Sequence, residues 1–100
     1  MKTEIVVNQG VEEIKRLCAK HALSPMELSL YLHVTWTRIY EIISGKRRIT
    51  PETDILLCKF FDLTPGYFAQ RQLEYDLMIA TRSLEEKLKT VPRVHDTLKA

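Results

Sequence analysis

The amino-acid sequence predicts an all-α domain of five helices, and three observations support this prediction. Apolar residues recur three and four positions apart, which is the spacing of one face of an α-helix. A Ser-Pro or Thr-Pro pair occurs three times, and each pair joins a helix-capping side chain to a residue suited to the first helical position. The chain contains only three glycines and four prolines, so long helices are favoured over the turn-rich pattern of an all-β domain.

The length and composition fit a single globular domain over residues 1–100. Hydrophobic residues make up 45% and charged residues 28% of the chain, which is ordinary for a folded protein. The longest apolar runs, such as Ile55-Leu56-Leu57, are far shorter than a membrane span. The N-terminus MKTEIVVNQG lacks the long apolar run of a signal peptide. We therefore expect a cytoplasmic protein with no membrane contact.

The first helix is predicted over residues 11–20. Ile14, Leu17 and Cys18 lie at positions i, i+3 and i+4 and share one face of that helix. Cys58 also lies within a helical pattern, and the two cysteines show no C-x-x-C spacing. Both are therefore expected to be buried free thiols rather than metal ligands or a disulfide.

The second and third helices are predicted to be joined by a sharp turn. Ser24 caps the start of the second helix and Thr35 the start of the third, so the second helix must end near His33. Gly45 ends the third helix, because glycine adopts the left-handed conformation at little cost. So short a joint is typical of a helix-turn-helix. The small core that fixes its angle is predicted to contain Leu28, Leu32, Val34, Ile39 and Ile42.

The fourth and fifth helices are predicted from the two Thr-Pro pairs. Thr50-Pro51 starts the fourth helix, and Asp54 lies in its first turn, where the helix dipole favours an anion. Thr64-Pro65 starts a long C-terminal helix over residues 65–89, and a later proline ends it.

The basic residues are concentrated around the third helix. Residues 35–48 contain four cations against one acid, a net charge of +3 (4 − 1), whereas the whole chain carries only +2. Such a local excess on a nearly neutral protein indicates a surface that binds a polyanion. The four cations are Arg38, Lys46, Arg47 and Arg48.

Two segments of the chain resemble known families. Residues 24–48, SPMELSLYLHVTWTRIYEIISGKRR, resemble the lambda-repressor-like helix-turn-helix, with a small residue in its second helix and a closing S-G-K-R. Residues 45–77 resemble the HigA-type antitoxins, also called the virulence-associated protein I group. In that group G-K-R-x-I-T leads to a helix, a turn containing Ser/Thr-Pro and a long helix carrying Y-D-L. The resemblance spans roughly residues 8–88.

The chain departs from the family pattern at several positions. His33 stands where the turn usually has glycine, and histidine tolerates the left-handed conformation better than most residues. Pro25 and Met26 replace polar residues that often contact phosphate. Trp36 and Tyr40 are unusual in the third helix. The operator sequence of a relative therefore does not carry over.

The third helix is predicted to read DNA with its N-terminal residues, because that end of a recognition helix enters the major groove. Arg38 can bridge O6 and N7 of guanine, whereas Trp36 can stack or contact a thymine methyl group. Thr35 and Ser44 suit phosphate contacts. The alternative is that Trp36 packs on a neighbouring helix and the cations form a solvated surface. The predicted DNA-binding residues are Thr35, Trp36, Thr37, Arg38, Tyr40, Ser44, Lys46, Arg47 and Arg48.

No catalytic residue, metal site or cofactor is predicted. Cys18 and His21 are spaced i, i+3, but two ligands do not make a zinc site. His33 lies in the turn and His95 in the C-terminal tail. No serine is marked by an organised base. We therefore expect that the protein is not an enzyme.

The long C-terminal helix carries an apolar stripe that is too long for the core of so small a domain. Its inner part is expected to pack on the first helix, and its outer part to join two subunits. A two-fold dimer doubles the DNA contact and requires an inverted-repeat operator. The predicted dimer-interface residues are Leu77, Leu84 and Leu88.

The resemblance implies a homodimeric DNA-binding antitoxin of a type II toxin-antitoxin system. Such a protein represses its own operon and neutralises an mRNA-cleaving toxin of the HigB type. Two alternatives stay open. One is a stand-alone repressor-like regulator without a toxin partner, and the other is a protein-binding module whose helix-turn-helix no longer binds DNA.

Overall fold

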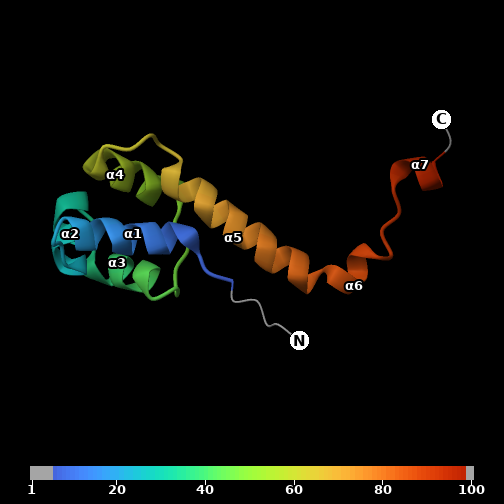
Figure 1. The fold of residues 1–100 in the computed structure, drawn as a ribbon, viewed down its shortest axis with the longest axis horizontal. Helices are drawn as coiled ribbons and strands as arrows, with labels where there is room; N and C mark the ends of the chain where they lie inside the picture. The colour runs from blue at the N-terminus through green and yellow to red at the C-terminus, as the bar shows by residue number, and fades with distance from the viewer. Residues whose placement is uncertain (1–5, 99–100) are drawn as a thin grey trace.

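The computed structural model describes residues 6–98 and shows an all-α fold over this range, as predicted. Within these residues it has seven helices rather than the expected five, because the predicted fifth helix is divided into two and a further single-turn helix follows it (Figure 1). The helices are α1 (Gln9–Lys20), α2 (Pro25–Leu32), α3 (Trp36–Ile43), α4 (Pro51–Phe61), α5 (Tyr67–Ser83), α6 (Glu85–Leu88) and α7 (Val94–Thr97).

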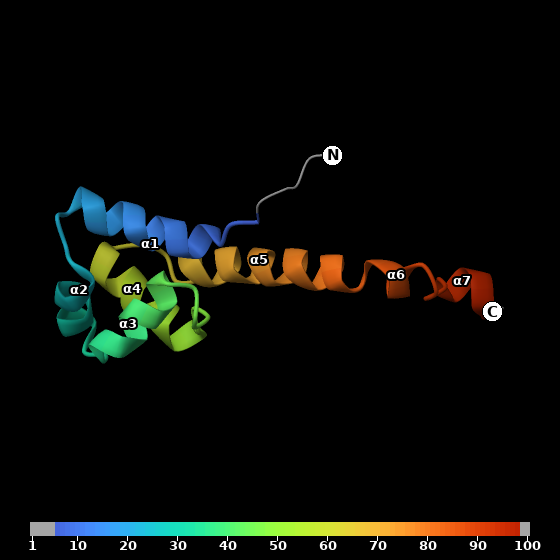
Figure 2. The same ribbon diagram turned by 90° about the horizontal axis from the view of Figure 1, so that it is seen from below.

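The first four helices and the start of α5 surround one hydrophobic core (Figure 2). The small core predicted for the helix-turn-helix is confirmed, with Val34 partly buried and the other four residues buried. Both cysteines are buried free thiols, also as predicted. The core consists of Val11, Ile14, Leu17, Cys18, Leu28, Leu32, Ile39, Ile42, Ile49, Leu57, Cys58 and Phe68.

The joint between α2 and α3 has the expected form. His33 adopts the left-handed conformation, with φ 57° and ψ 40°. The next amide, at Val34, donates to the carbonyl of Ser29, 3.1 Å away, and the buried small side chain of Ser29 lets the two helices approach closely. Thr35 caps α3 by accepting a hydrogen bond from the backbone of Arg38. These bonds fix the direction in which α3 leaves the turn.

The start of α5 differs from the prediction. The expectation that Thr64 caps this helix and Pro65 opens it is wrong, because α5 begins at Tyr67 and its N-cap is Gly66, with φ 101°. The cap is instead supplied by Asp54 of α4, which is only 2% exposed. Its carboxylate accepts from the amides of Gly66 at 2.6 Å, Phe68 at 2.8 Å and Ala69 at 2.9 Å. A carboxylate in α4 therefore joins α4 to α5.

Gln72 is the last buried residue of α5, and the helix continues as an arm, which we define as residues 73–98 and which extends away from the globular part (Figure 1). The radius of gyration is 17.9 Å, compared with about 13 Å for a compact chain of this length. The helix predicted over residues 65–89 is divided into α5 and α6 at Leu84. None of the described helices combines the length and hydrophobicity needed to cross a membrane.

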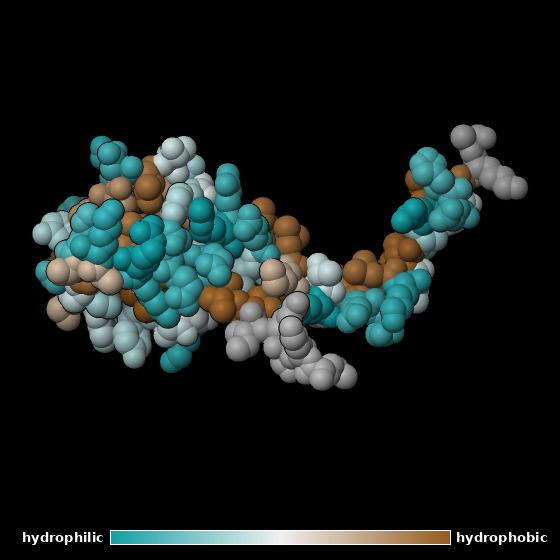
Figure 3. Space-filling view, viewed as in Figure 1, coloured by the Kyte–Doolittle hydropathy of each residue, from teal (hydrophilic) through white to brown (hydrophobic). Residues whose placement is uncertain are grey.

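The arm exposes apolar side chains along its length, and they form hydrophobic patches in the space-filling view (Figure 3). The inner part of α5 packs on α1, as predicted, and also on α4, whereas the outer part packs on neither. The exposed apolar residues of the arm are Leu73, Leu77, Met78, Ile79, Leu84, Leu88, Val91, Val94 and Leu98.

Candidate nucleic-acid interface

The exposed face of α3 carries the predicted reading residues. Ile39 and Ile42 are buried and hold the opposite face of the helix against the core. Trp36 is 47% exposed and Tyr40 is 51% exposed. Their rings lie 5.3 Å apart between centroids and are tilted by 32°, so they form one aromatic surface beside the N-terminus of α3. Such a surface can contact base edges or sugar carbons without a polar partner.

The cations around α3 differ in their surroundings. Arg38 and Lys46 form no hydrogen bond or ion pair through their side chains with any residue in the range 6–98. Arg47 pairs with Glu41, with Nη2 3.2 Å from Oε1. Arg48 pairs with Asp76 of α5. Two of the four cations are therefore free to bind an anion, and two must first release a carboxylate.

The remaining predicted positions lie at the two ends of α3. Thr37 is exposed near the N-terminus. The hydroxyl of Ser44, the C-cap, donates to the carbonyl of Glu41 at 3.2 Å. Thr35 already accepts the backbone amide of Arg38, so its hydroxyl hydrogen is the part left to donate to a phosphate. The structure thus brings the nine predicted residues together on α3 and the loop that follows it.

The loop of residues 44–50, which we call the basic loop, is fixed to α5 by Gln72. Sequence reasoning missed this residue. Gln72 is only 3% exposed. Its Oε1 accepts from the backbone of Ile49 at 3.0 Å and from Nδ2 of Asn8 at 2.8 Å. Its Nε2 donates to Oδ1 of Asp76 at 2.9 Å. One buried amide therefore holds the basic loop, the start of α1 and α5 in a fixed arrangement.

Only a weak signal in the sequence points to Gln72. It lies four residues after the buried Phe68, on the face of α5 that meets the core. A polar residue at such a position needs hydrogen-bond partners when it is buried. The sequence does not identify those partners, because Asn8 and Ile49 are 64 and 23 positions away.

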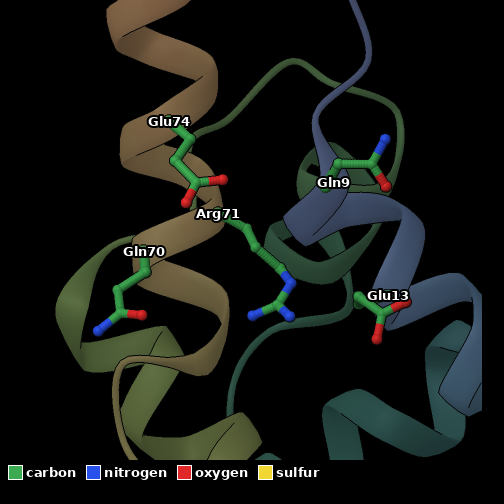
Figure 4. Close-up of a pocket in the computed structure, with 5 residues that line it drawn as sticks. All are labelled: Gln9, Glu13, Gln70, Arg71 and Glu74. Atoms are coloured by element: carbon green, nitrogen blue, oxygen red, sulfur yellow. The ribbon is translucent and has the colours of Figure 1, made fainter.

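A polar groove of about 420 Å³ lies between α1 and α5 (Figure 4). Arg71 extends from α5 toward Glu13 of α1 (Figure 4), and its guanidinium lies 3.8 Å from the ring centroid of Tyr67. Hydrogen bonds from Arg16 and then Tyr67 lower the pKa of Glu13 to about 2. Glu13 therefore stays ionised near neutral pH. The hydroxyl of Tyr67 donates to the carboxylate of Glu13, and this hydrogen bond joins α5 to α1.

Several solved structures share this fold. HigA of Pseudomonas aeruginosa, solved with the higBA promoter, is 20% identical with a TM-score of 0.80, and the match covers 89% of this chain and 97% of that one. The fold is that of HigA antitoxins. A HigA-family addiction module antidote protein from Coxiella burnetii is 26% identical with a TM-score of 0.79, covering 90% and 100% of the two chains.

A third structure has the same fold. PA4674 of Pseudomonas aeruginosa, solved in complex with its 18-bp operator DNA, is 20% identical with a TM-score of 0.82, and the match covers 91% of this chain and 99% of that one. No family model matches the chain, and no curated protein matches it significantly. The likeness to HigA structures thus lies in the fold and extends from the helix-turn-helix into the arm.

Proposed function

We propose that this protein is a DNA-binding antitoxin of a type II toxin-antitoxin system that represses its own operon and neutralises a HigB-type toxin in the cytoplasm. The observation that carries the proposal is the arrangement of α3. Its apolar face is buried, its reading residues are exposed or half-exposed, and cations follow within one loop. The HigA-like fold supports the same assignment, since two of the matched proteins were solved with a promoter or operator.

In the proposed complex, the N-terminal end of α3 enters the major groove. Arg38 and Thr37 reach base edges, while Trp36 and Tyr40 contact bases or sugars beside them. Thr35, Ser44 and the three cations after α3 hold the sugar-phosphate backbone, which fixes the position of the helix without reading sequence.

The DNA-binding part of the proposal is tested by replacing Arg47 and Arg48 together with alanine. We expect binding to specific and random duplexes to weaken alike, because phosphate contacts carry no sequence information. The dependence of log K on log salt should flatten by up to about one unit for each phosphate that is no longer bound. Fluorescence anisotropy over a series of salt concentrations measures both quantities.

The matched control replaces Lys15 and Lys20 with alanine. These two exposed lysines belong to α1, which lies on the opposite side of the globular part from α3 (Figure 2). Their replacement removes the same formal charge, so a smaller effect separates local contact from net charge. Equal effects of the two double substitutions would remove Arg47 and Arg48 from the interface.

The arm is proposed to form the interface of a two-fold dimer, centred on Leu77, Leu84 and Leu88. We expect Leu84→Asp to yield monomers, because a charge cannot be buried in an apolar interface without a partner. Leu30→Asp, at an exposed leucine of α2, is the control for the same chemical change. Sedimentation at micromolar concentration measures the assembly. A wild-type protein that sediments only as a monomer would refute the proposed dimer.

The toxin part of the proposal is tested separately. A short basic reading frame of the RelE-like kind beside this gene would identify the partner, and co-expression should relieve the growth arrest that the partner causes alone. Absence of such a frame, with intact DNA binding, would favour the stand-alone regulator. Absence of DNA binding would favour the protein-binding module.

A further inference from the structure

The ion pair between Arg48 and Asp76 joins α5 to the basic loop, whose cations the proposed function assigns to phosphate contacts. Nε of Arg48 is 3.0 Å from Oδ2 of Asp76, and Nη2 also donates to the same oxygen. The Arg48 side chain is 67% exposed and that of Asp76 is 29% exposed. The guanidinium is therefore accessible from solvent, but its Nε and Nη2 donors already bind the carboxylate of Asp76.

The carboxylate of Asp76 is held in place by its second oxygen. Oδ1 accepts from Nε2 of Gln72, and Gln72 is itself fixed by Ile49 and Asn8. The hydrogen bond from Arg48 lowers the pKa of Asp76, and Gln72 adds to this effect. Asp76 therefore stays ionised near neutral pH, in a position set by a buried side chain.

A carboxylate and a DNA phosphate bind a guanidinium in the same way, through oxygens that accept from its N–H groups. We propose that Asp76 lowers the DNA affinity of this protein. In the free protein its carboxylate occupies the same N–H donors of Arg48 that a backbone phosphate binds in the complex. This inference rests on the proposed function. Exposed ion pairs contribute little to stability, so a phosphate can displace the carboxylate.

The second ion pair of the loop lacks this arrangement. Glu41 contacts Arg47 from within α3, and its described hydrogen bonds include no buried partner that holds the carboxylate. Asp76, in contrast, belongs to α5 and lies where the arm begins. The occupation of Arg48 is thus set by a different part of the molecule from the one that reads DNA.

The test is Asp76→Asn, which removes the charge and keeps an oxygen that can accept from Gln72. With a fluorescently labelled duplex of random sequence, we expect binding to tighten several-fold at low salt and the salt slope to steepen by up to about one unit. In an Arg48→Ala background the same substitution should have no more effect than Glu74→Gln, because a double-mutant cycle isolates the pair. Glu74→Gln, on the same helix but lining the groove against α1, is the control for loss of one negative charge.

Each outcome decides the inference. A gain with Asp76→Asn that disappears without Arg48 and exceeds that of Glu74→Gln supports it. Unchanged or weaker binding would overturn it and make Asp76 a residue that positions Arg48 for DNA. A gain of equal size without Arg48 would also overturn it, as an effect of net charge. If the wild-type protein itself binds no duplex at low salt, the proposed function fails first. Thermal unfolding of each variant confirms that the compared proteins are folded.

Discussion

Asp54→Ala is expected to lower the free energy of unfolding by about 3 kcal/mol or more, because a charged acceptor contributes up to several kcal/mol and its loss leaves donors unpaired. The buried carboxylate accepts three backbone amides at the start of α5. In the alanine variant the amides of Gly66, Phe68 and Ala69 lose their shared partner. Since a domain of this size has a total stability of roughly 5–15 kcal/mol, the loss should be visible as a large shift in a urea unfolding curve.

Two further variants define the cause of this effect. Glu52→Ala removes an exposed acid from the same first turn of α4 and should cost little. Asp54→Asn keeps one acceptor oxygen and should fall between the two alanine variants. If Asp54→Ala and Glu52→Ala shift the unfolding midpoint equally, the cap of α5 does not depend on Asp54.

Arg38→Ala is expected to relax sequence preference at one base pair in each half-site, beyond any uniform loss of affinity. A bidentate contact to guanine contributes roughly 1–3 kcal/mol of discrimination. The side chain is available for this contact, because within the described part of the chain it has no ion pair. Selection from randomised duplexes, carried out with the wild type and the variant, shows which position loses its preference.

The matched control for this selection is Lys46→Ala. Lys46 is also a cation without an ion pair among the described residues, but it lies after α3 rather than at its reading end. Its replacement should weaken binding and leave the selected motif unchanged. Identical motifs from wild type and Arg38→Ala would show that Arg38 reads no base. Recovery of no motif from the wild type would favour the protein-binding module.

The helix-turn-helix could be predicted from the sequence because its signals are local. Ser24 and Thr35 cap helices that begin at the next residue, and His33 ends α2 in a conformation set within the turn. The residues that position the basic loop and the start of α5 could not be found in this way. Gln72 and Asp54 act on partners 12 to 64 positions away, and such distant hydrogen bonds leave no periodic pattern.

The end of α5 at Ser83 could not be predicted from the spacing of apolar residues either. The stripe of leucines continues past residue 83, but the hydroxyls of Thr81 and Ser83 donate back to the carbonyls of Leu77 and Ala80. Short polar side chains that bond to the backbone in this way compete with continued helix. Periodicity records which residues can share a face, and it does not record this competition.

The continuity of α5 has a mechanical consequence. The helix begins inside the core and runs for 17 residues without a break, which is a rigid rod of about 25 Å. No flexible linker lies between Gln72, which holds the basic loop, and the exposed Leu77 further along the same helix. A partner that binds the α5 part of the arm therefore also sets the orientation of α3. A domain on a flexible tether loses orientational entropy when it binds, and this rigid connection avoids that loss.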